Sequence, residues 1–217
     1  MPKPKRTPSL LTIVVPIYNE AASLPVFLPG LLRYCQMRNW RLVLVNDGST
    51  DGSLDIIKQQ KNVQRAVVIT HKVNRGYGGA LKSGITAANT PYVVTIDGDG
   101  QHEPEDIDKL LAFASQRDAD LVVGKREQNI TDDWYRKLGK WTIRNFTKIL
   151  MPLPIRDLNS GFKLYRTELA QKYLRLCPDS MAFSDVITLI FINQHNLVLE
   201  HPVRVNKREK GKSTITT

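Results

Sequence analysis

Two aspartates separated by one glycine, Asp97 and Asp99, carry the sharpest chemical signal in the sequence. They follow an apolar run at residues 92–96, which predicts a buried strand that ends at the first acid. Two carboxylates at this spacing can share Mg²⁺ or Mn²⁺ with a diphosphate, because these hard cations prefer oxygen ligands. Gln101 and His102 follow closely enough to add a ligand or a supporting contact.

The same motif has a simpler interpretation as a turn. An aspartate at this point can cap the helix expected near Pro104, since a carboxylate accepts hydrogen bonds from the first N–H groups of a helix. Taken alone, the motif favours neither the metal site nor the turn. An EF-hand is disfavoured, because its sixth position is His102 rather than glycine and its twelfth is Asp108 rather than glutamate.

The rest of the chain predicts how these acids are positioned. Apolar β-branched runs alternate with segments whose apolar residues recur at helical spacing. The expected strands are residues 10–15, 42–45, 66–70, 92–96, 121–123, 162–165 and 197–203. The expected helices are residues 20–33, 51–60, 79–88, 105–116, 132–151, 168–176 and 184–194. This alternation predicts an α/β domain with a Rossmann-like, mainly parallel sheet flanked by helices.

Polar and glycine residues follow each of the first five expected strands. They are residues 16–20, 46–51, 74–79, 97–102 and 124–126. Ligands of open parallel sheets bind at the carboxyl ends of the strands, so we expect these residues to meet on one rim. This clustering is stronger evidence for a site than any single motif.

Two of these segments need separate interpretation. Capping of a helix by Thr50 or Asp51 leaves Asp47 unexplained, and Asp47 stands where it can accept hydrogen bonds from a base or ribose. Residues 76–79 are typical of a loop packed around a ligand or of a simple turn. They fail the dinucleotide pattern G-x-G-x-x-G, because Leu81 occupies its last position.

Composition narrows the partners. The chain has 217 residues and a formal charge of +10, from 31 basic and 21 acidic side chains. That excess favours an anionic partner, or it is simply a solvated basic surface. Cys35 and Cys177 form no CxxC motif, which suits a reducing compartment. The sequence has no secretory signal, and its longest apolar runs are far shorter than the roughly 20 residues that span a bilayer. We therefore expect a cytoplasmic location and no transmembrane segment in this chain. Whether a C-terminal segment was removed stays open.

The expected helix at residues 132–151 mixes Trp134 and Trp141 with lysine and arginine. This composition suits a helix lying in the plane of an anionic membrane surface, at its cytoplasmic face. It equally suits an amphipathic helix packed on the sheet with its basic side in water. Both interpretations stay open.

Together the motifs resemble glycosyltransferase family 2, which has the GT-A fold, and within it the dolichyl- or polyprenyl-phosphate sugar synthases. The resemblance rests on VVPIYNE, VNDGSTDGS, NRGYGGALKSGI, TIDGDGQHEPE, VVGKR, IRDLNSGFKLYR and the R-x-x-G-x-S of residues 208–213. It implies one catalytic domain at residues 10–205, with a nucleotide-sugar half (10–126) and an acceptor half (127–205). Residues 1–9 would be a flexible basic start, and residues 206–217 would close over the site.

The resemblance also implies roles for individual residues. The nucleotide-sugar would contact Pro16, Tyr18, Glu20, Asp47, Arg75, Gly76, Asp97, Gly98 and Asp99. Mg²⁺ or Mn²⁺ would bind Asp97, Asp99 and Gln101, with Asp99 favoured for direct ligation and Asp97 bridging towards the ribose and the metal. The phosphates would meet Arg126, Arg136 and Arg208. The acceptor would face Asp157, Ser160, Gly161, Phe162, Arg208 and Ser213. Thr214 departs from the family, which often has lysine there.

These roles imply an inverting, single-displacement transfer of a hexose from a GDP-mannose or UDP-glucose type of donor to a polyprenyl or dolichyl phosphate. A lipid phosphate is already anionic, so it needs alignment rather than a strong base. A saccharide hydroxyl, the alternative acceptor in cell-surface polysaccharide synthesis, would need a base such as Asp157.

Two further classes are disfavoured. A nucleotidyltransferase would carry a glycine-rich, basic signature directly after the first strand, and none is present. A nucleic-acid-binding module would gather basic and aromatic residues on one surface, whereas the expected strand ends carry acids. We therefore expect no nucleic-acid partner.

Overall fold

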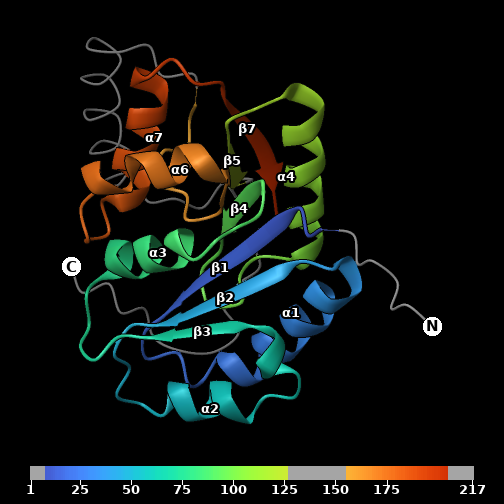
Figure 1. The fold of residues 1–217 in the computed structure, drawn as a ribbon, viewed down its shortest axis with the longest axis vertical. Coiled ribbons are helices and arrows are strands. Elements are labelled where there is room, and N and C mark those ends of the chain that lie inside the picture. Colours follow the sequence, from blue (N-terminus) through green and yellow to red (C-terminus); the bar gives the residue numbers. More distant parts are fainter. Residues whose placement is uncertain (1–7, 127–154, 205–217) are drawn as a thin grey trace, which may run out of the picture.

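The computed structural model describes residues 8–126 and 155–204, which form a mixed sheet flanked by helices (Figure 1). The strands are β1 (Leu11–Ile17), β2 (Arg41–Asn46), β3 (Val67–Thr70), β4 (Tyr92–Thr95), β5 (Leu121–Arg126), β6 (Lys163–Arg166) and β7 (Val198–Val203). The α-helices are α1 (Leu24–Arg38), α2 (Ser53–Gln59), α3 (Tyr77–Thr86), α4 (Pro104–Arg117), α6 (Thr167–Tyr173) and α7 (Phe183–Asn193). Short 3₁₀ turns occur at Val63–Arg65 and Leu174–Leu176.

The order of strands across the sheet is β3-β2-β1-β4-β6-β5-β7. The first four are parallel, as the alternation of the sequence predicts, and β7 is parallel to β5. Strand β6 runs antiparallel to both of its neighbours, β4 and β5. The carboxyl ends of β1, β2 and β4 therefore meet on one rim, while β6 brings the segment that precedes it to the same rim.

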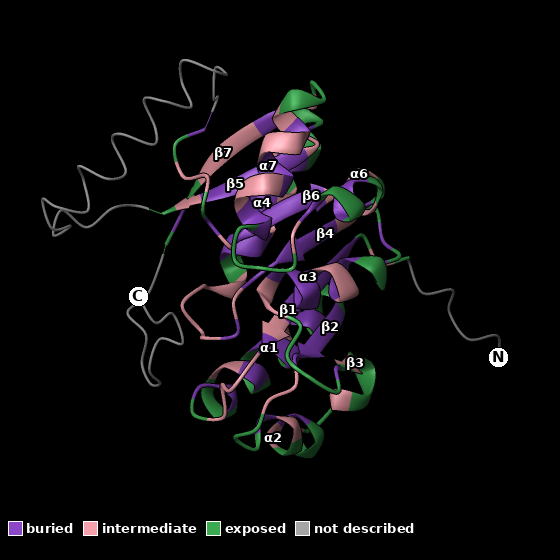
Figure 2. Cartoon of the chain, turned by 90° about the vertical axis from the view of Figure 1, so that its left-hand side faces the viewer, coloured by how far each residue is buried: buried purple, intermediate pink, exposed green. Residues whose placement is uncertain are grey.

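Apolar side chains fill both faces of this sheet. One core joins the sheet to α1, α2 and α4, and the other joins it to α3, α6 and α7. Figure 1 shows α3, α6 and α7 on the side opposite to α1 and α4, and Figure 2 shows buried residues concentrated in the central strands. This three-layer arrangement explains why the central strands are apolar runs rather than alternating sequences.

Several boundaries differ from the sequence expectation. Strand β1 continues through Pro16 to Ile17, which is tolerated because Pro16 lies beyond Val14, the last residue of β1 paired with β4. Strand β5 continues to Arg126 because each residue of it pairs with β7. The residues expected to follow this strand, 124–126, therefore belong to it.

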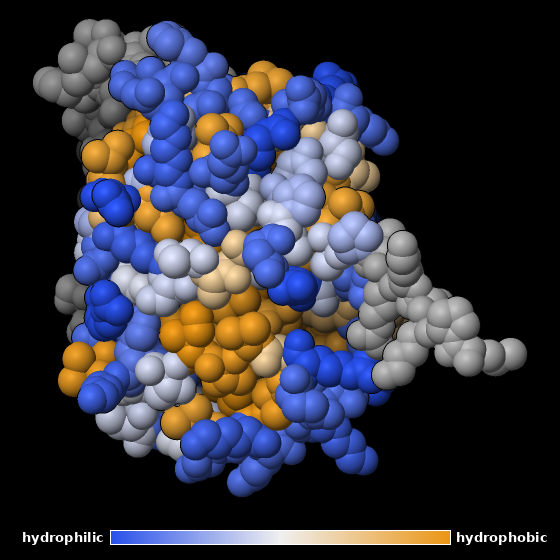
Figure 3. Space-filling view, in the orientation of Figure 1, coloured by the Kyte–Doolittle hydropathy of each residue, from blue (hydrophilic) through white to orange (hydrophobic). Residues whose placement is uncertain are grey.

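The surface also has an open edge. Strand β3 ends the sheet, and its Val67 is 51% exposed. In Figure 3 hydrophilic side chains cover much of this face, and an apolar area lies between α3 and α2. The two cysteines, Cys35 and Cys177, are free and buried.

Several sequence expectations lie outside the described residues. They are the helix at residues 132–151, residues 1–7 of the flexible start expected at residues 1–9, the segment at residues 206–217 and the site residues Arg136, Arg208, Ser213 and Thr214. Within the described ranges, none of the helices combines the length and the apolar character needed to cross a membrane.

Candidate active site

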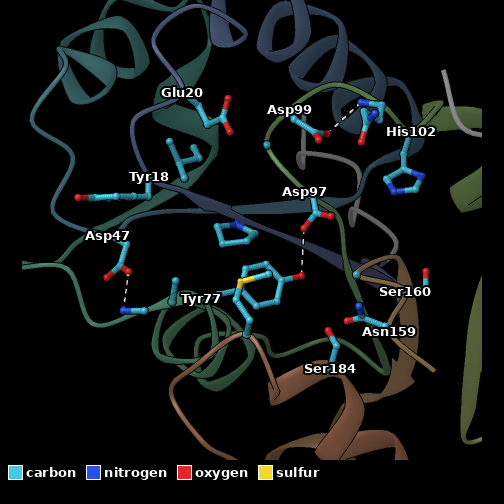
Figure 4. A pocket seen from close by; sticks show the side chains of 18 of the residues that line it. Tyr18, Glu20, Asp47, Tyr77, Asp97, Asp99, His102, Asn159, Ser160 and Ser184 are labelled. Atoms are coloured by element: carbon cyan, nitrogen blue, oxygen red, sulfur yellow. Dashed lines mark hydrogen bonds between the residues drawn. The ribbon is translucent and has the colours of Figure 1, made fainter. Parts of the chain in front are cut away.

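A pocket of about 600 Å³ opens at the carboxyl ends of β1, β2 and β4 (Figure 4). This volume falls within the usual range for small-molecule sites. The pocket brings together thirteen residues to which the sequence gives a site role: Pro16, Tyr18, Glu20, Asp47, Gly76, Asp97, Gly98, Asp99, Gln101, His102, Arg126, Ser160 and Gly161. The strand-end residues that were predicted to meet on one rim thus line a single cavity.

Three other expected residues do not line this pocket. Phe162 is fully buried and stacks against His102, with ring centroids 4.6 Å apart, so its role is to support the pocket wall. Arg75 is exposed, and its backbone N–H donates to the Asp47 carboxylate. Asp157 lies behind Arg126, whose guanidinium it binds.

The acid pair is not a helix cap. The N-cap position of α4 is occupied by Glu103, whose side chain makes no capping hydrogen bond. Asp99 instead accepts a hydrogen bond from the Gln101 N–H at 3.1 Å. Asp97 accepts one from the Tyr77 hydroxyl at 3.0 Å. In Figure 4 Asp97 points toward Tyr77, and Asp99 points toward the backbone ahead of His102. The capping interpretation of this motif is therefore wrong.

Burial and the adjacent Asp99 carboxylate raise the pKa of Asp97 to about 6. The hydrogen bond from Tyr77 and the charge of Arg126 act in the opposite direction, but they do not overcome burial. A buried carboxylate beside a second carboxylate is unfavourable in the absence of a cation. A cation bound between the two carboxylates would therefore stabilise their ionised forms.

A glycine of the loop before β6 lies directly against this acid. A Cβ on Gly161 would be 2.7 Å from both Asp97 Oδ2 and the Tyr77 hydroxyl. Thr95 Oγ1 donates a hydrogen bond to the Gly161 carbonyl at 2.7 Å and so fixes this approach. The loop expected to face the acceptor is thus held in contact with the acid pair.

We expect Gly161→Ala to lower kcat/KM of the reaction at this pocket by about 10²-fold, because displacement of a reacting group by about 1 Å has that effect. The new methyl group would force Asp97 or Tyr77 to move. Gly30→Ala is the matched control, because a Cβ there meets nothing within 4 Å. Steady-state kinetics of both variants check the expectation, and equal activities would contradict it.

Asp47 has more protein partners than the sequence suggests. Its Oδ1 accepts from the Arg75 N–H and the His71 Nδ1–H, and its Oδ2 accepts from the Gly76 N–H. His71 is buried, and its Nε2 lies 2.9 Å from Ser83 Oγ. These bonds fix the loop before α3, and they use about three of the roughly four lone-pair positions of a carboxylate.

The capping expected near Asp47 is also corrected. The cap position of α2 is Gly52 rather than Thr50 or Asp51, although Asp51 Oδ1 still accepts the Ser53 N–H at 3.0 Å. Asp51 Oδ2 also accepts the Ala21 N–H at 2.9 Å. Asp51 thus joins the loops after β1 and β2 and steadies the rim of the pocket.

Glu20 belongs to the same rim. Ser23 Oγ lies 2.8 Å from Glu20 Oε2 and 3.2 Å from the Gly98 carbonyl, so one hydroxyl joins the loop after β1 to the acid motif. The charge of Glu20 contributes slightly to the raised pKa of Asp97. The cavity is therefore lined by four carboxylates, those of Glu20, Asp47, Asp97 and Asp99, and Arg126 also lines it.

Sequence reasoning missed three lining residues, Asn159, Met181 and Ser184, and it placed Tyr77 on the rim without giving its side chain a role. The signal for Tyr77 lay in the glycine-rich loop, where a single aromatic residue among glycines invites a side-chain role. Met181 and Ser184 precede or begin α7 and reach the pocket only because of the fold. Within the described residues no group of three or more His, Cys, Asp or Glu side chains forms a metal site.

The family model described as "Glycosyl transferase family 2" matches residues 12–174. The chain belongs to this family. It is 30% identical over 207 residues to the undecaprenyl-phosphate 4-deoxy-4-formamido-L-arabinose transferase of Proteus mirabilis, covering 94% of this chain and 62% of the relative. The enzyme of the same name from Aeromonas hydrophila is 29% identical, with the same coverage of both chains. The chain thus spans about three-fifths of these relatives.

Solved structures share the fold. Glucosyl-3-phosphoglycerate synthase from Mycobacterium tuberculosis, in complex with Mn²⁺, UDP-glucose and phosphoglyceric acid, aligns with a TM-score of 0.66 and 16% identity. The alignment covers 93% of this chain and 73% of that one. Staphylococcus aureus TarS with UDP-GlcNAc aligns with a TM-score of 0.63 and 18% identity, covering 91% and 60%. The fold of this family member is therefore GT-A, as the sequence motifs predict.

Proposed function

We propose that the protein transfers a hexose from a nucleotide-sugar to a polyprenyl phosphate. One observation carries the proposal: the acid pair, Arg126 and the loop expected to face the acceptor all line one pocket at the strand ends. Acids bind the cation that a diphosphate requires, and a guanidinium binds phosphate directly. The same pocket can therefore hold the reacting groups of both substrates.

The donor is proposed to enter past β1 and β2. Tyr18 offers an aromatic surface for the base, and Asp47 has about one lone-pair position left for a base or ribose N–H or O–H. This geometry suits a nucleoside placed beside the loop before α3, with its diphosphate directed toward the acid pair. GDP-mannose and UDP-glucose are the proposed types of donor.

The donor set of the acid motif fits a hard divalent cation. Asp97 and Asp99 supply carboxylates and Gln101 supplies an amide oxygen. Burial, and then the charge of Asp99, raise the pKa of Asp97, and a bound cation would offset both. Two carboxylates and an amide leave room for substrate phosphates as further ligands. Bound Mg²⁺ or Mn²⁺ would stabilise the charge that develops on the departing nucleoside diphosphate.

The proposed acceptor is a lipid phosphate rather than a hydroxyl. A phosphate oxygen is anionic near neutral pH, so the residues around it need to align it rather than deprotonate it. Arg126 and the polar Asn159 and Ser160 line the pocket, and we propose them as the contacts of the acceptor. The undecaprenyl-phosphate enzymes, to which the chain is similar, favour the same class of acceptor.

The net charge of +10 supports peripheral contact with an anionic membrane surface at its cytoplasmic face. A lipid-linked acceptor presents its phosphate at such a surface. Nucleic acid is a poorer partner, because the described pocket has carboxylates along its wall.

The proposal is tested with the purified chain, a panel of UDP- and GDP-sugars, and undecaprenyl or dolichyl phosphate. We expect one nucleotide family to raise the melting temperature more with Mn²⁺ than without it, because a ligand that binds only the folded state stabilises it. We expect radiolabelled sugar to move to lipid phosphate and not to a saccharide hydroxyl. Transfer only to a hydroxyl, or no stabilisation by any nucleotide, would refute the proposal.

A further inference from the structure

Asp157, expected from the sequence to act as a base toward a hydroxyl acceptor, is bound to an arginine on both oxygens. Arg126 Nε lies 3.0 Å from Asp157 Oδ2, and Arg126 Nη2 lies 3.2 Å from Oδ1. A bidentate pair of this kind fixes the plane of a guanidinium as well as its position. The same contacts occupy the oxygens that would take up a proton, so this geometry suits the holding of Arg126 better than base catalysis.

A second acid holds Asp157 from behind. Glu200 lies in β7, directly beside Val123 of β5, and its Oε1 accepts the backbone N–H of Asp157 at 2.7 Å. The same oxygen accepts the backbone N–H of Arg156. Glu200 thus fixes the backbone from which the Asp157 side chain projects. It does not line the pocket and cannot act on a substrate directly.

Arg126 connects this support to the pocket. Arg126 lines the pocket, and its charge acts on Asp97 and on His102, lowering the pKa of both. Arg126 is the last residue of β5, and its side chain is about half exposed. The strand alone therefore does not define the orientation of its guanidinium. Two of its five N–H donors are committed to Asp157, which leaves the orientation of the others set by that pair.

We propose that Glu200 and Asp157 are positioning residues that orient Arg126 toward the phosphates of the donor or acceptor. The inference rests on the proposed function, because it assigns the guanidinium to phosphate. Glu200 holds the backbone at residues 156–157 through two hydrogen bonds. The Asp157 carboxylate in turn holds the Arg126 guanidinium. Asp157 neither gains nor loses a proton in this role.

The experiment compares Glu200→Ala, Glu200→Gln and Arg126→Ala with the double variant of Arg126→Ala and Glu200→Ala. Affinity for UDP or GDP with Mn²⁺ is measured by calorimetry, and kcat and KM are measured for transfer. We expect Glu200→Ala to weaken nucleotide binding or raise KM by about tenfold, within the range of coupled residues. Glu200→Gln keeps an acceptor oxygen and should restore most of this loss.

Coupling decides between support of Arg126 and general damage. In the Arg126→Ala background, Glu200→Ala should have almost no further effect, because the residue that it positions is gone. The inference would be overturned if the loss in the double variant equalled the product of the losses in the two single variants. Equal losses in Glu200→Gln and Glu200→Ala would also overturn it. The control is Glu168→Ala, which removes an exposed acid of α6 and should behave as the wild type.

Asp157→Asn separates positioning from base catalysis. The amide keeps one acceptor for Arg126, so we expect kcat to fall by less than about tenfold, with the larger change in KM or nucleotide affinity. A loss of kcat by about 10³-fold with unchanged binding would instead establish a base and overturn this assignment. If the wild type binds nucleotide but transfers no sugar, the proposed function fails, while the calorimetric cycle still tests the positioning of Arg126.

Discussion

Asp97→Asn is expected to lower kcat/KM for sugar transfer by about 10²–10³-fold and, without metal at neutral pH, to make the folded protein more stable. The two effects have one cause. The carboxylate is buried beside Asp99, which raises its pKa to about 6, so the charge that binds a cation is unfavourable until the cation arrives. Asparagine keeps an acceptor for the Tyr77 hydroxyl but removes the charge.

The pH dependence follows from that pKa. Between about pH 4 and pH 6 folded Asp97 retains its proton, while the unfolded chain, with the ordinary value of 3.8, releases it. The unfolded state binds fewer protons, so the free energy of unfolding falls as pH rises through this range. The gain in Asp97→Asn should therefore be near zero below pH 4 and reach at most about 3 kcal/mol at pH 7.

Urea unfolding of the wild type and Asp97→Asn from pH 4 to pH 8, in the presence of a chelator, measures this difference. Mn²⁺ with nucleotide should then stabilise the wild type and not the variant. Asp55→Asn, at an exposed acid in the first turn of α2, is the control and should show neither effect. A variant that is less stable than the wild type at pH 7 would show that the charge of Asp97 is already compensated within the protein.

Asp99→Asn should lose transfer to a similar extent, because the proposed cation needs both carboxylates. Its side chain accepts the Gln101 N–H in the described structure, and asparagine can accept the same bond. The loss would therefore report on metal and diphosphate rather than on the local turn. Transfer by Asp99→Asn at wild-type rates would remove Asp99 from the site.

The parallel half of the fold was predictable because its information is local. Residues 11–15, 42–45 and 93–94 are apolar runs buried on both sides, and each is followed by polar residues at one rim. Since parallel strands place their carboxyl ends together, the presence of Asp97, Asp47 and Tyr18 on one rim follows from the alternation.

The acceptor half could not be read in the same way. Strand β6 inserts antiparallel between β4 and β5, and no local pattern states which strands a four-residue segment will pair. The bonds of Asp97 to Tyr77 and of Asp157 to Arg126 join residues 20 and 31 positions apart. Spacing revealed that these residues were polar and near strand ends, but only tertiary structure shows which of them face the pocket and which hold another residue.

Lys163 is the clearest residue that the sequence did not reveal, and Lys163→Met is expected to destabilise the protein by about 2–4 kcal/mol. Its side chain is fully buried, and Nζ bonds the Leu158 carbonyl, the Ser184 carbonyl and Thr188 Oγ1. Methionine fills a similar volume but leaves two buried carbonyl groups without this donor. The loss should also raise KM for the acceptor, because Leu158 precedes the lining residues Asn159 and Ser160.

The stability contributed by Lys163 should increase with pH. Burial lowers its pKa from 10.5 to about 7, so above pH 7 the folded protein has lost a proton that the unfolded chain keeps until about pH 10.5. The unfolded state then binds more protons, and the free energy of unfolding rises with pH across this range. As a neutral amine, Lys163 keeps two N–H donors, which suffice for both carbonyl groups, while the Thr188 hydroxyl donates to the Ser184 carbonyl.

Urea unfolding at pH 6, pH 8 and pH 9 measures this effect in the wild type, Lys163→Met and the exposed control Lys61→Met. The difference between the wild type and Lys163→Met should grow with pH, while Lys61→Met should follow the wild type throughout. A difference that stays constant would mean that Lys163 keeps its charge when folded, stabilised by Asp185 and Asp157, whose charges oppose the effect of burial. In that case three charge-assisted bonds, rather than a neutral amine, would connect the loop before β6 to α7, and the loss in Lys163→Met should exceed that of an ordinary hydrogen-bonded residue.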